Sequence, residues 1–185
     1  MPIASYNLYR IRKLRPSLTI EACKQVVHGL VLSHLDYCNS LYIGLPTVDL
    51  NRLQRIQNAA ARLVLMKSNY SNPKVLLKEL HWLPIMYRIK YKVLTIVFHC
   101  IHGSAPQYLQ RHIQLKSPSQ YHLRSNSHAC ILQVPQTRAA TFAANSFSVY
   151  GPREWNKLPT ELRVCPDFAK FRKDLKTYLF SFAYM

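Results

Sequence analysis

The residues of this sequence that could do chemistry are mainly arginines and lysines at helical spacing. Four polar side chains lie on one side of a helix predicted over residues 46–67: Arg52, Arg55, Asn58 and Arg62. Arg88 and Lys92 form a second stripe, four residues apart. Rows of such cations neutralise the phosphates of a nucleic-acid backbone. The other interpretation of each stripe is the solvated face of an amphipathic helix. Neither stripe reads base identity, so we expect little sequence specificity.

The groups needed for nucleotidyl transfer are missing from the sequence. Two-metal catalysis requires clustered carboxylates, whereas the four aspartates are isolated from one another: Asp36, Asp49, Asp167 and Asp174. The chain has four glycines and no glycine-rich phosphate loop. Its eight histidines belong to no motif of a serine–histidine–aspartate site. We therefore predict no catalytic residue, no cofactor, no small-molecule substrate and no enzymatic activity.

Two cysteines and two histidines are close enough in sequence to raise the question of zinc. Cys23, His28, His34 and Cys38 fall within sixteen residues, and zinc would require all four to converge tetrahedrally. On one helix, Cys23 and His28 point about 140° apart, because the helix has 3.6 residues per turn. We therefore expect no metal site. Both histidines are predicted to lie at the surface or its boundary, and both cysteines in the core.

The charge of the chain is its most unusual bulk property. Twenty-five lysines and arginines face eight aspartates and glutamates, which gives a net charge of +17 over 185 residues. Four of the cations lie within six residues: Arg10, Arg12, Lys13 and Arg15. A folded protein with this charge should bind polyanions, either nucleic acid or an acidic membrane surface. A merely soluble basic protein would share the composition. With 49% hydrophobic and 18% charged residues, the chain is predicted to be globular.

Cysteine usage and the length of apolar runs bear on location. The five cysteines are far apart and form no CxxC pair, which predicts reduced thiols in an intracellular protein, nuclear or cytoplasmic. The polar, arginine-rich start does not resemble a signal peptide. No apolar run approaches the roughly 20 residues that a membrane span needs, so we expect no membrane partner.

The stretch from Leu80 to Gly103 has the clearest helical pattern. Pro84 suits the first turn, where a missing N–H has no consequence, and Gly103 suits the left-handed residue that ends a helix. The apolar residues follow the spacing of one helix face: Ile85, Ile89, Val93, Ile96, Val97, Cys100 and Ile101. A narrow polar stripe remains, made of Arg88, Lys92, Thr95 and His99. Trp82 is predicted to cover the core where this helix begins.

The other elements are predicted from caps, breakers and apolar spacing. Thr19 or Ser17 begins a helix that reaches about Leu35, and Asn72 with Pro73 begins a short one. Further helical segments are predicted over residues 106–113 and 138–149, and a last helix begins at residues 166–167. Residues 116–128 are expected to form an exposed loop and residues 130–135 one short strand. Residues 150–159 are expected to form a turn-rich block around a buried Trp155.

These elements predict a mainly α fold. Residues 1–115 are expected to form a helical bundle. Residues 116–185 are expected to form a small C-terminal α+β subdomain, which contains the exposed loop, the short strand and the last helices and either packs on the bundle or stands beside it.

Five motifs occur along the chain in one order. They are Leu35-Asp36-Tyr37-Cys38-Asn39-Ser40-Leu41, Leu53 to Arg62, Leu80-His81-Trp82-Leu83-Pro84, His102-Gly103-Ser104-Ala105-Pro106, and Phe147 to Pro159. In this order they resemble the thumb and the segment after the palm in reverse transcriptases of jockey-like and related non-LTR (LINE) retrotransposons. The resemblance covers nearly the whole chain. Two residues depart from the family's pattern: Lys90, where relatives often carry an acidic residue, and Glu154, where they often carry an apolar one.

The resemblance implies a thumb-like bundle that lies against the backbone of a primer–template duplex. Arg55, Asn58 and Arg62 would then lie nearest the duplex, and the partner would be RNA or an RNA–DNA hybrid. The family's fingers, its palm with a Tyr-x-Asp-Asp motif, and its endonuclease are not matched. The resemblance therefore implies a truncated, non-catalytic fragment of an RNA-directed DNA polymerase. The alternatives are a helical module that docks on another protein, such as an intact reverse transcriptase, and a relic without function.

Overall fold

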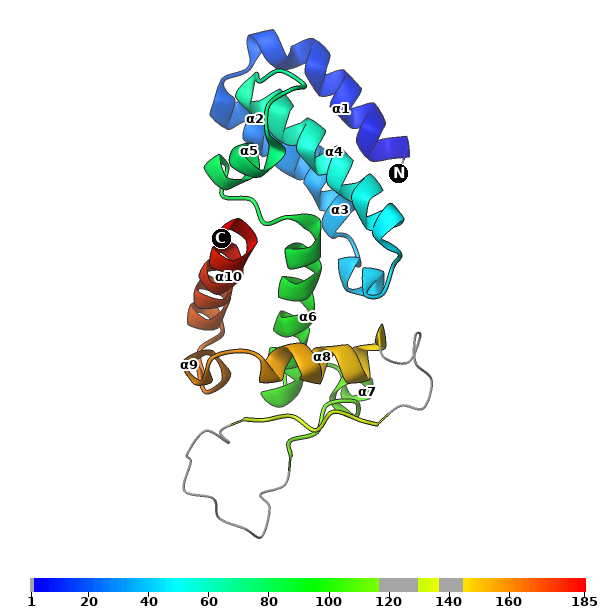
Figure 1. Ribbon diagram of the computed structural model, residues 1–185, viewed down its shortest axis with the longest axis vertical. Coiled ribbons are helices and arrows are strands. Elements are labelled where there is room, and N and C mark those ends of the chain that lie inside the picture. The colour runs from blue at the N-terminus through cyan, green and yellow to red at the C-terminus, as the bar shows by residue number, and fades with distance from the viewer. Residues whose placement is uncertain (1, 117–129, 137–144) are drawn as a thin grey trace. The chain divides into compact units, whose positions relative to one another are not determined.

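The computed structural model describes residues 2–116, 130–136 and 145–185 (Figure 1). This part of the chain is mainly α-helical, as predicted. None of its helices combines the length and the apolar character that crossing a membrane requires. Of the predicted elements, nearly all of the loop 116–128 and most of the helix 138–149 lie outside the described residues.

The helices pack into two compact units. The first comprises residues 1–89 and 180–185, and the second comprises residues 90–179. The long helix α6, Ile85–Ile101, and the last helix α10, Phe168–Tyr184, each contribute to both units. This division describes how the residues pack against one another. It does not test the predicted domain boundary at residue 115, which stays a prediction.

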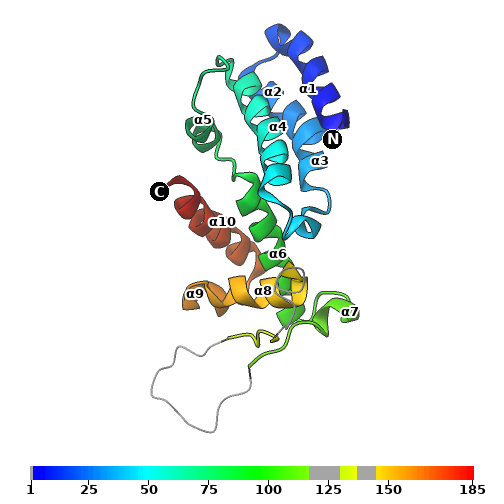
Figure 2. The ribbon, with the colours of Figure 1, turned by 45° about the vertical axis from the view of Figure 1, so that its right-hand side comes forward.

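The first unit contains helices α1 to α5. Their bounds are Pro2–Leu14 for α1, Ile20–Val27 for α2, Ser33–Asp36 for α3, Thr47–Leu65 for α4 and Pro73–Glu79 for α5. Helix α1 lies alongside α4 in both ribbon views (Figures 1 and 2). The side chains of Ala60 and Ala61 are fully buried on α4. Because these side chains are small, α1 and α2 can approach α4 closely.

The predicted starts of α2 and α5 are confirmed. The Thr19 hydroxyl accepts a hydrogen bond from the backbone N–H of Ala22 at 3.2 Å, so Thr19 rather than Ser17 is the N-cap. The Asn72 side chain accepts one from the N–H of Lys74 at 3.0 Å. From α2 the helix continues into α3, as predicted. Between them, residues His28–Leu32 form a π turn, a widened turn that holds one extra residue.

A buried arginine closes the C-terminal end of α4. Arg15 donates hydrogen bonds to the carbonyl oxygens of Leu63 at 2.9 Å, Val64 at 2.8 Å and Leu18 at 2.6 Å. The last carbonyls of a helix have no partner within it, and a cation is favourable beside them. Arg15 thus provides hydrogen-bond donors for the last carbonyl oxygens of α4. It also fixes the segment that follows α1 to the end of α4.

Met66 ends α4 in the left-handed region, with a φ of 52°. The N–H of Lys67 bonds to the Arg62 carbonyl at 3.0 Å, a pattern that usually has glycine at the position of Met66. We expect Met66→Gly to raise the free energy of unfolding by about 0.5–1 kcal/mol, because glycine adopts this conformation without a Cβ clash. The exposed Met66 side chain contributes little packing. Urea unfolding measures the change, and Met66→Ala, which keeps the Cβ, should give no gain. Equal stabilities of the two variants would contradict the argument.

Helix α6 is the predicted central helix. Pro84 precedes it and its carbonyl accepts a helical hydrogen bond at 2.9 Å, so Pro84 caps the helix rather than forming its first turn. Gly103 follows it with a φ of 69°, which confirms the left-handed residue predicted there. Thr95 is buried, although it was expected in the polar stripe. Burial is tolerated because its hydroxyl donates to the Lys92 carbonyl at 2.7 Å.

The second unit contains most of α6 and α10, together with three shorter helices. Their bounds are Gln107–Gln110 for α7, Phe147–Asn156 for α8 and Thr160–Arg163 for α9. Helix α10 begins as predicted, because both carboxylate oxygens of Asp167 accept hydrogen bonds from N–H groups of its first turn at 3.1 Å. In the core, the rings of Phe98 and Phe171 stack with centroids 4.5 Å apart. Other buried residues of this unit include Val93, Leu94, Val97, Leu132, Val149, Trp155, Leu175 and Leu179.

The strand predicted over residues 130–135 is wrong. The described residues contain a single antiparallel bridge, between Leu115 and Leu132, and no strand. On one edge of this segment Ile131 and Gln133 pair with the backbone of Lys116 and Gln114. On the other edge the Asn156 side-chain amide donates to the Leu132 carbonyl at 2.8 Å and accepts from its N–H at 2.9 Å. This side chain satisfies both backbone groups that a neighbouring strand would otherwise pair. The described part of the chain therefore has no α+β subdomain.

The block predicted as turns over residues 150–159 is helical as far as Asn156. Gly151 and Pro152 lie inside α8, and both are buried. A Cβ atom on Gly151 would lie 2.9 Å from Cγ2 of Val97, on α6. Glycine therefore serves the close packing of two helices here, and not the turn that it indicates elsewhere.

Candidate nucleic-acid interface

The candidate interface is built on the solvent side of α4. Arg52 and Arg55 are exposed there, and Asn58 and Arg62 are half-buried. The opposite side of the helix lies in the core through five buried residues: Leu53, Gln57, Ala60, Ala61 and Val64. The four predicted residues of α4 thus share one face. We call Arg52, Arg55 and Arg62 the α4 cationic stripe.

The three arginines of this stripe differ in what holds them. Arg52 pairs with Asp49 one turn earlier at 3.1 Å, an exposed pair of little energetic weight. Arg55 makes no ion pair within the described part of the chain. Arg62 donates to the Ser71 carbonyl at 3.4 Å, while its Nε is buried without a partner among the described residues. An unpaired buried donor costs free energy, which a phosphate that drew Arg62 outward would relieve.

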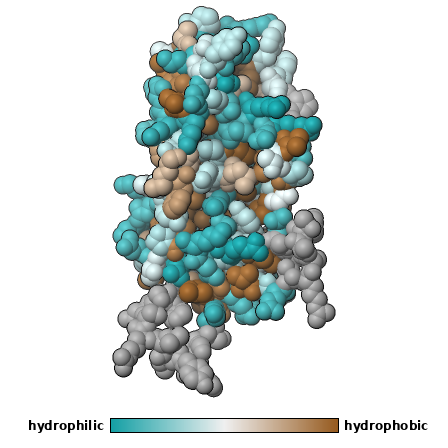
Figure 3. Space-filling view, viewed as in Figure 1, coloured by the Kyte–Doolittle hydropathy of each residue, from teal (hydrophilic) through white to brown (hydrophobic). Residues whose placement is uncertain are grey.

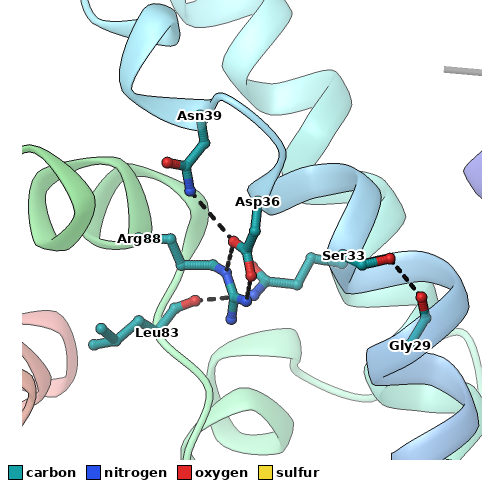
Figure 4. A network of polar contacts seen from close by, with 7 residues as sticks. Gly29, Ser33, Asp36, Asn39, Leu83 and Arg88 are labelled. Atoms are coloured by element: carbon teal, nitrogen blue, oxygen red, sulfur yellow. Dashed lines mark hydrogen bonds and ion pairs between the residues drawn. The ribbon is translucent and has the colours of Figure 1, made fainter.

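Arg88 is separate from this stripe because a carboxylate holds it. Its Nε donates to Oδ1 of Asp36 at 2.7 Å, and a terminal nitrogen bonds to Oδ2 (Figure 4). Asn39 also donates to Asp36, at 3.3 Å. The Arg88 side chain is only 14% exposed. Its charge is neutralised within the fold by a two-point contact, so Arg88 links α3 to the start of α6 instead of facing solvent as predicted.

Lys92 is exposed on α6 and makes no ion pair with any described residue. It belongs to the second unit, whereas the α4 cationic stripe belongs to the first. The second predicted stripe is therefore not a row of free cations, because Arg88 is paired with Asp36. What remains of it is one exposed lysine.

Two glutamines of α4 connect the motif Leu53 to Arg62 with the start of α6. The sequence analysis did not single them out. Gln57 is fully buried and donates to the Leu83 carbonyl at 2.9 Å. Gln54 accepts a hydrogen bond from the N–H of Ile85 at 2.9 Å and so caps the start of α6. The signal in the sequence is a polar side chain at position 57, on the apolar side of a predicted helix. Such a group needs a partner when it is buried.

The residues predicted as structural lie in or beside the cores of the units. Trp82 is buried where α6 begins, and Pro84 next to it is half-buried. The Tyr184 hydroxyl donates to the Trp82 carbonyl. Burial raises the pKa of Tyr184 to about 12. Trp155 is fully buried, and its indole N–H donates to the Cys130 carbonyl at 2.9 Å.

The side chains considered as zinc ligands form no metal site. Among the described residues, no group of three or more histidine, cysteine, aspartate or glutamate side chains could hold a metal ion. His28 and His34 are exposed, and Cys23 is in the core. Burial raises the pKa of the Cys23 thiol, against a smaller opposing effect of Arg15. Cys38 is exposed rather than buried as predicted, because it turns the chain after α3 with a φ of 49°.

Comparisons with known proteins give no relative from which a function could be transferred. No protein-family model, curated protein or solved structure matches the chain. The resemblance to non-LTR reverse transcriptases therefore stays a prediction, based on the five motifs and their order.

Proposed function

We propose that this chain is a non-catalytic part of a reverse transcriptase of the non-LTR retrotransposon class. In this proposal it binds the backbone of RNA or an RNA–DNA hybrid with little sequence specificity. The observation that carries the proposal is the α4 cationic stripe, in a chain with a net charge of +17. Arg52 and Arg62 are ten residues apart, so the stripe extends over about 15 Å, a length that spans several phosphates.

The packing of the motifs supports the resemblance. Asp36 of the first motif is paired with Arg88, in the turn of α6 that follows the third motif. Gln54 and Gln57 of the second motif hold the backbone at the third. Motifs that belong to one common fold are expected to contact one another in this way. The first three of the five motifs are thus neighbours in the first unit.

We propose binding without catalysis. Three of the aspartates are engaged by the chain itself: Asp36 pairs with Arg88, Asp167 caps α10, and Asp49 makes an exposed pair with Arg52. A polymerase instead needs carboxylates that converge on two metal ions. The contribution of this chain would then be to hold a nucleic acid, which requires cations and no catalytic group.

The test is a salt titration of binding to a labelled RNA–DNA hybrid, with Arg55→Glu/Arg62→Glu as the variant. For the wild type, log affinity should fall linearly with log salt, with a slope of about −0.9 for each phosphate neutralised. We expect the double variant to lose about two units of this slope and ~10–100-fold in affinity at about 0.1 M salt. Arg55→Gln/Arg62→Gln separates the loss of contacts from new repulsion.

The matched control is Lys170→Glu/Lys173→Glu, which reverses two exposed charges on α10 and changes the net charge equally. If the stripe contacts phosphates, the α4 variant loses much more affinity than this control. Equal losses would show diffuse attraction and refute the assignment to α4. A folded wild-type chain that ignores both hybrid and RNA at low salt would refute the proposed function itself.

A second candidate function is docking on another protein, such as an intact reverse transcriptase. Three large apolar side chains are exposed between the end of α3 and the first turn of α4: Tyr37, Leu41 and Val48. An interface would bury them. Co-sedimentation with the polymerase that is weakened by Leu41→Ser would favour this function. The remaining alternative, a relic without function, is favoured if the purified chain shows no cooperative unfolding.

A further inference from the structure

The outer side of α1 is an aromatic and cationic surface that the proposed function leaves unused. We define the α1 surface as Tyr6, Tyr9, Arg10 and Lys13, all of which are exposed. Each tyrosine is four residues before a cation, so the two side chains meet on the helix. The Arg10 guanidinium lies 5.9 Å from the centroid of the Tyr6 ring, and Lys13 Nζ lies 4.7 Å from that of Tyr9. The surface is therefore a pair of cation–aromatic contacts on consecutive turns.

The two tyrosines of this surface contribute little to the core. Tyr6 is 59% exposed and Tyr9 is 57% exposed. Helix α1 packs through its other side instead, where Ala4 and Ile11 are buried. Neither tyrosine hydroxyl has a hydrogen-bond partner among the described residues. Much of each ring is therefore open to a ligand.

The helix that carries this surface is fixed to the unit. Asn7 donates to the Leu30 carbonyl at 2.8 Å, and Arg15 fastens the chain after α1 to the end of α4. Binding to a surface that is already ordered costs less conformational entropy than binding to a flexible segment. The α1 surface is therefore pre-organised for contact.

We propose that the α1 surface binds an unpaired nucleic-acid strand. Tyrosine rings offer faces on which bases stack, and Arg10, Lys13 and the neighbouring Arg12 offer charges for phosphates. The first acidic residue of the chain is Glu21, so no carboxylate on α1 repels the backbone. The inference rests on the proposed function for its class of ligand. It adds a second site in which α1 takes an unpaired strand while α4 takes a duplex.

Two other occupants fit the α1 surface less well. A helix that lies on a membrane needs a continuous apolar face toward lipid. The apolar side of α1 is instead buried in the unit, and its exposed Ile3 and Leu14 lie at opposite ends. Figure 3 shows hydrophilic and apolar side chains intermixed on the face of the molecule that it draws. An acidic protein partner would explain the cations of the α1 surface, but it would not explain the two exposed tyrosine rings beside them.

The test compares binding of the full chain to labelled oligouridylate and to an RNA–DNA hybrid, each of about 12 nucleotides, by fluorescence anisotropy. We expect Tyr6→Ala/Tyr9→Ala to weaken oligouridylate binding by ~10–100-fold and hybrid binding by less than about 3-fold. Tyr6→Phe/Tyr9→Phe keeps both rings and should bind oligouridylate within about 3-fold of the wild type. Both tyrosines are exposed, so circular dichroism should show that the variants fold.

The outcomes distinguish this inference from the proposed function. Arg55→Glu/Arg62→Glu should weaken hybrid binding more than oligouridylate binding. Oligouridylate binding that is unchanged in Tyr6→Ala/Tyr9→Ala, with hybrid binding intact, would refute the inference alone. Absence of all nucleic-acid binding by the folded wild type would refute the proposed function with it. Binding to phosphatidylserine vesicles that the two alanines abolish, without oligouridylate binding, would assign the surface to a membrane and also refute the inference.

Discussion

Lys90→Asp is expected to lower the free energy of unfolding by about 3 kcal/mol, because it breaks a buried ion pair and adds a like charge. Lys90 Nζ lies 2.6 Å from Oε2 of Glu154, and Lys157 Nζ lies 2.6 Å from Oε1. The Glu154 side chain is only 7% exposed, whereas that of Lys157 is 61% exposed. Lys90 is thus the more buried partner, and an aspartate there would leave the carboxylate facing a second negative charge.

Glu154→Leu supplies the matched rescue. Removing one partner of a buried ion pair costs stability, but the two lysines left behind are 30% and 61% exposed and can turn to water. This change alone should therefore cost less than Lys90→Asp, about 1–2 kcal/mol. The double variant Lys90→Asp/Glu154→Leu should then be more stable than Lys90→Asp. Urea unfolding of the four proteins gives the coupling energy between the two positions. A double variant no more stable than Lys90→Asp would show that the two side chains are not coupled.

The same pair predicts a dependence of stability on pH. Burial alone would raise the pKa of Glu154, but hydrogen bonds from Lys157 and Lys90 and their charges hold it below the ordinary value of 4.5. The unfolded chain therefore binds this proton more readily than the folded one. The stabilisation is complete above pH 4.5 and is lost as the pH falls through the lower pKa of the folded protein. Glu154→Leu should remove this part of the acid sensitivity.

Lys90 and Glu154 are also the two positions at which the chain departs from the pattern of the family proposed for it. Each departure taken alone would introduce an unmatched group into the second unit. Together they form one ion pair. Their relation could not be predicted from the sequence, because the two residues lie on different helices, α6 and α8, far apart along the chain.

Arg15→Met is expected to lower the free energy of unfolding by about 2–4 kcal/mol. Three carbonyl oxygens would lose a donor at once, and two of them belong to the last turn of α4. Methionine keeps an unbranched apolar stem of similar length, so the change mainly tests the hydrogen bonds and the charge. Arg15→Lys keeps the charge without the planar fork of donors and should fall between the wild type and Arg15→Met.

The control for this prediction is Arg12→Met, which removes an exposed arginine from the same cluster of cations. Surface substitutions of this kind change stability by less than about 0.5 kcal/mol. Chemical unfolding with urea, followed by circular dichroism, measures all three variants. Similar losses for Arg12→Met and Arg15→Met would show that the contacts of Arg15 with α4 do not contribute to stability.

The helices could be predicted because their signals are local. Thr19, Asn72 and Asp167 accept hydrogen bonds from N–H groups two or three residues later, and Gly103 ends a helix through its own backbone conformation. The predictions of a strand and of a turn-rich block were wrong because the contacts that decide these segments are not local. Asn156 pairs with a backbone segment 24 residues away, and Gly151 packs against a different helix.

The candidate site shows the same division between local and distant causes. The face of α4 that carries Arg55 follows from helical periodicity within one segment, and the structure has it exposed. Arg88 and Arg15 also look like surface cations in the sequence. Each is instead held by a partner on another helix, the Asp36 carboxylate for Arg88 and the carbonyls of α4 for Arg15. Whether a basic residue is free for a ligand thus depends on contacts that periodicity does not contain.

The π turn at His28–Leu32 is the place where the α2–α3 helix could lose a residue without turning its two parts relative to each other. A π turn holds one residue more than a regular α-helical turn. Deleting one residue there would restore a regular helix, and Asp36 would still face Arg88. A deletion elsewhere in the helix would rotate the residues between it and the π turn by about 100°, which would move core side chains such as Val27 toward solvent. Among related chains, a difference in length within this helix should therefore fall at this turn.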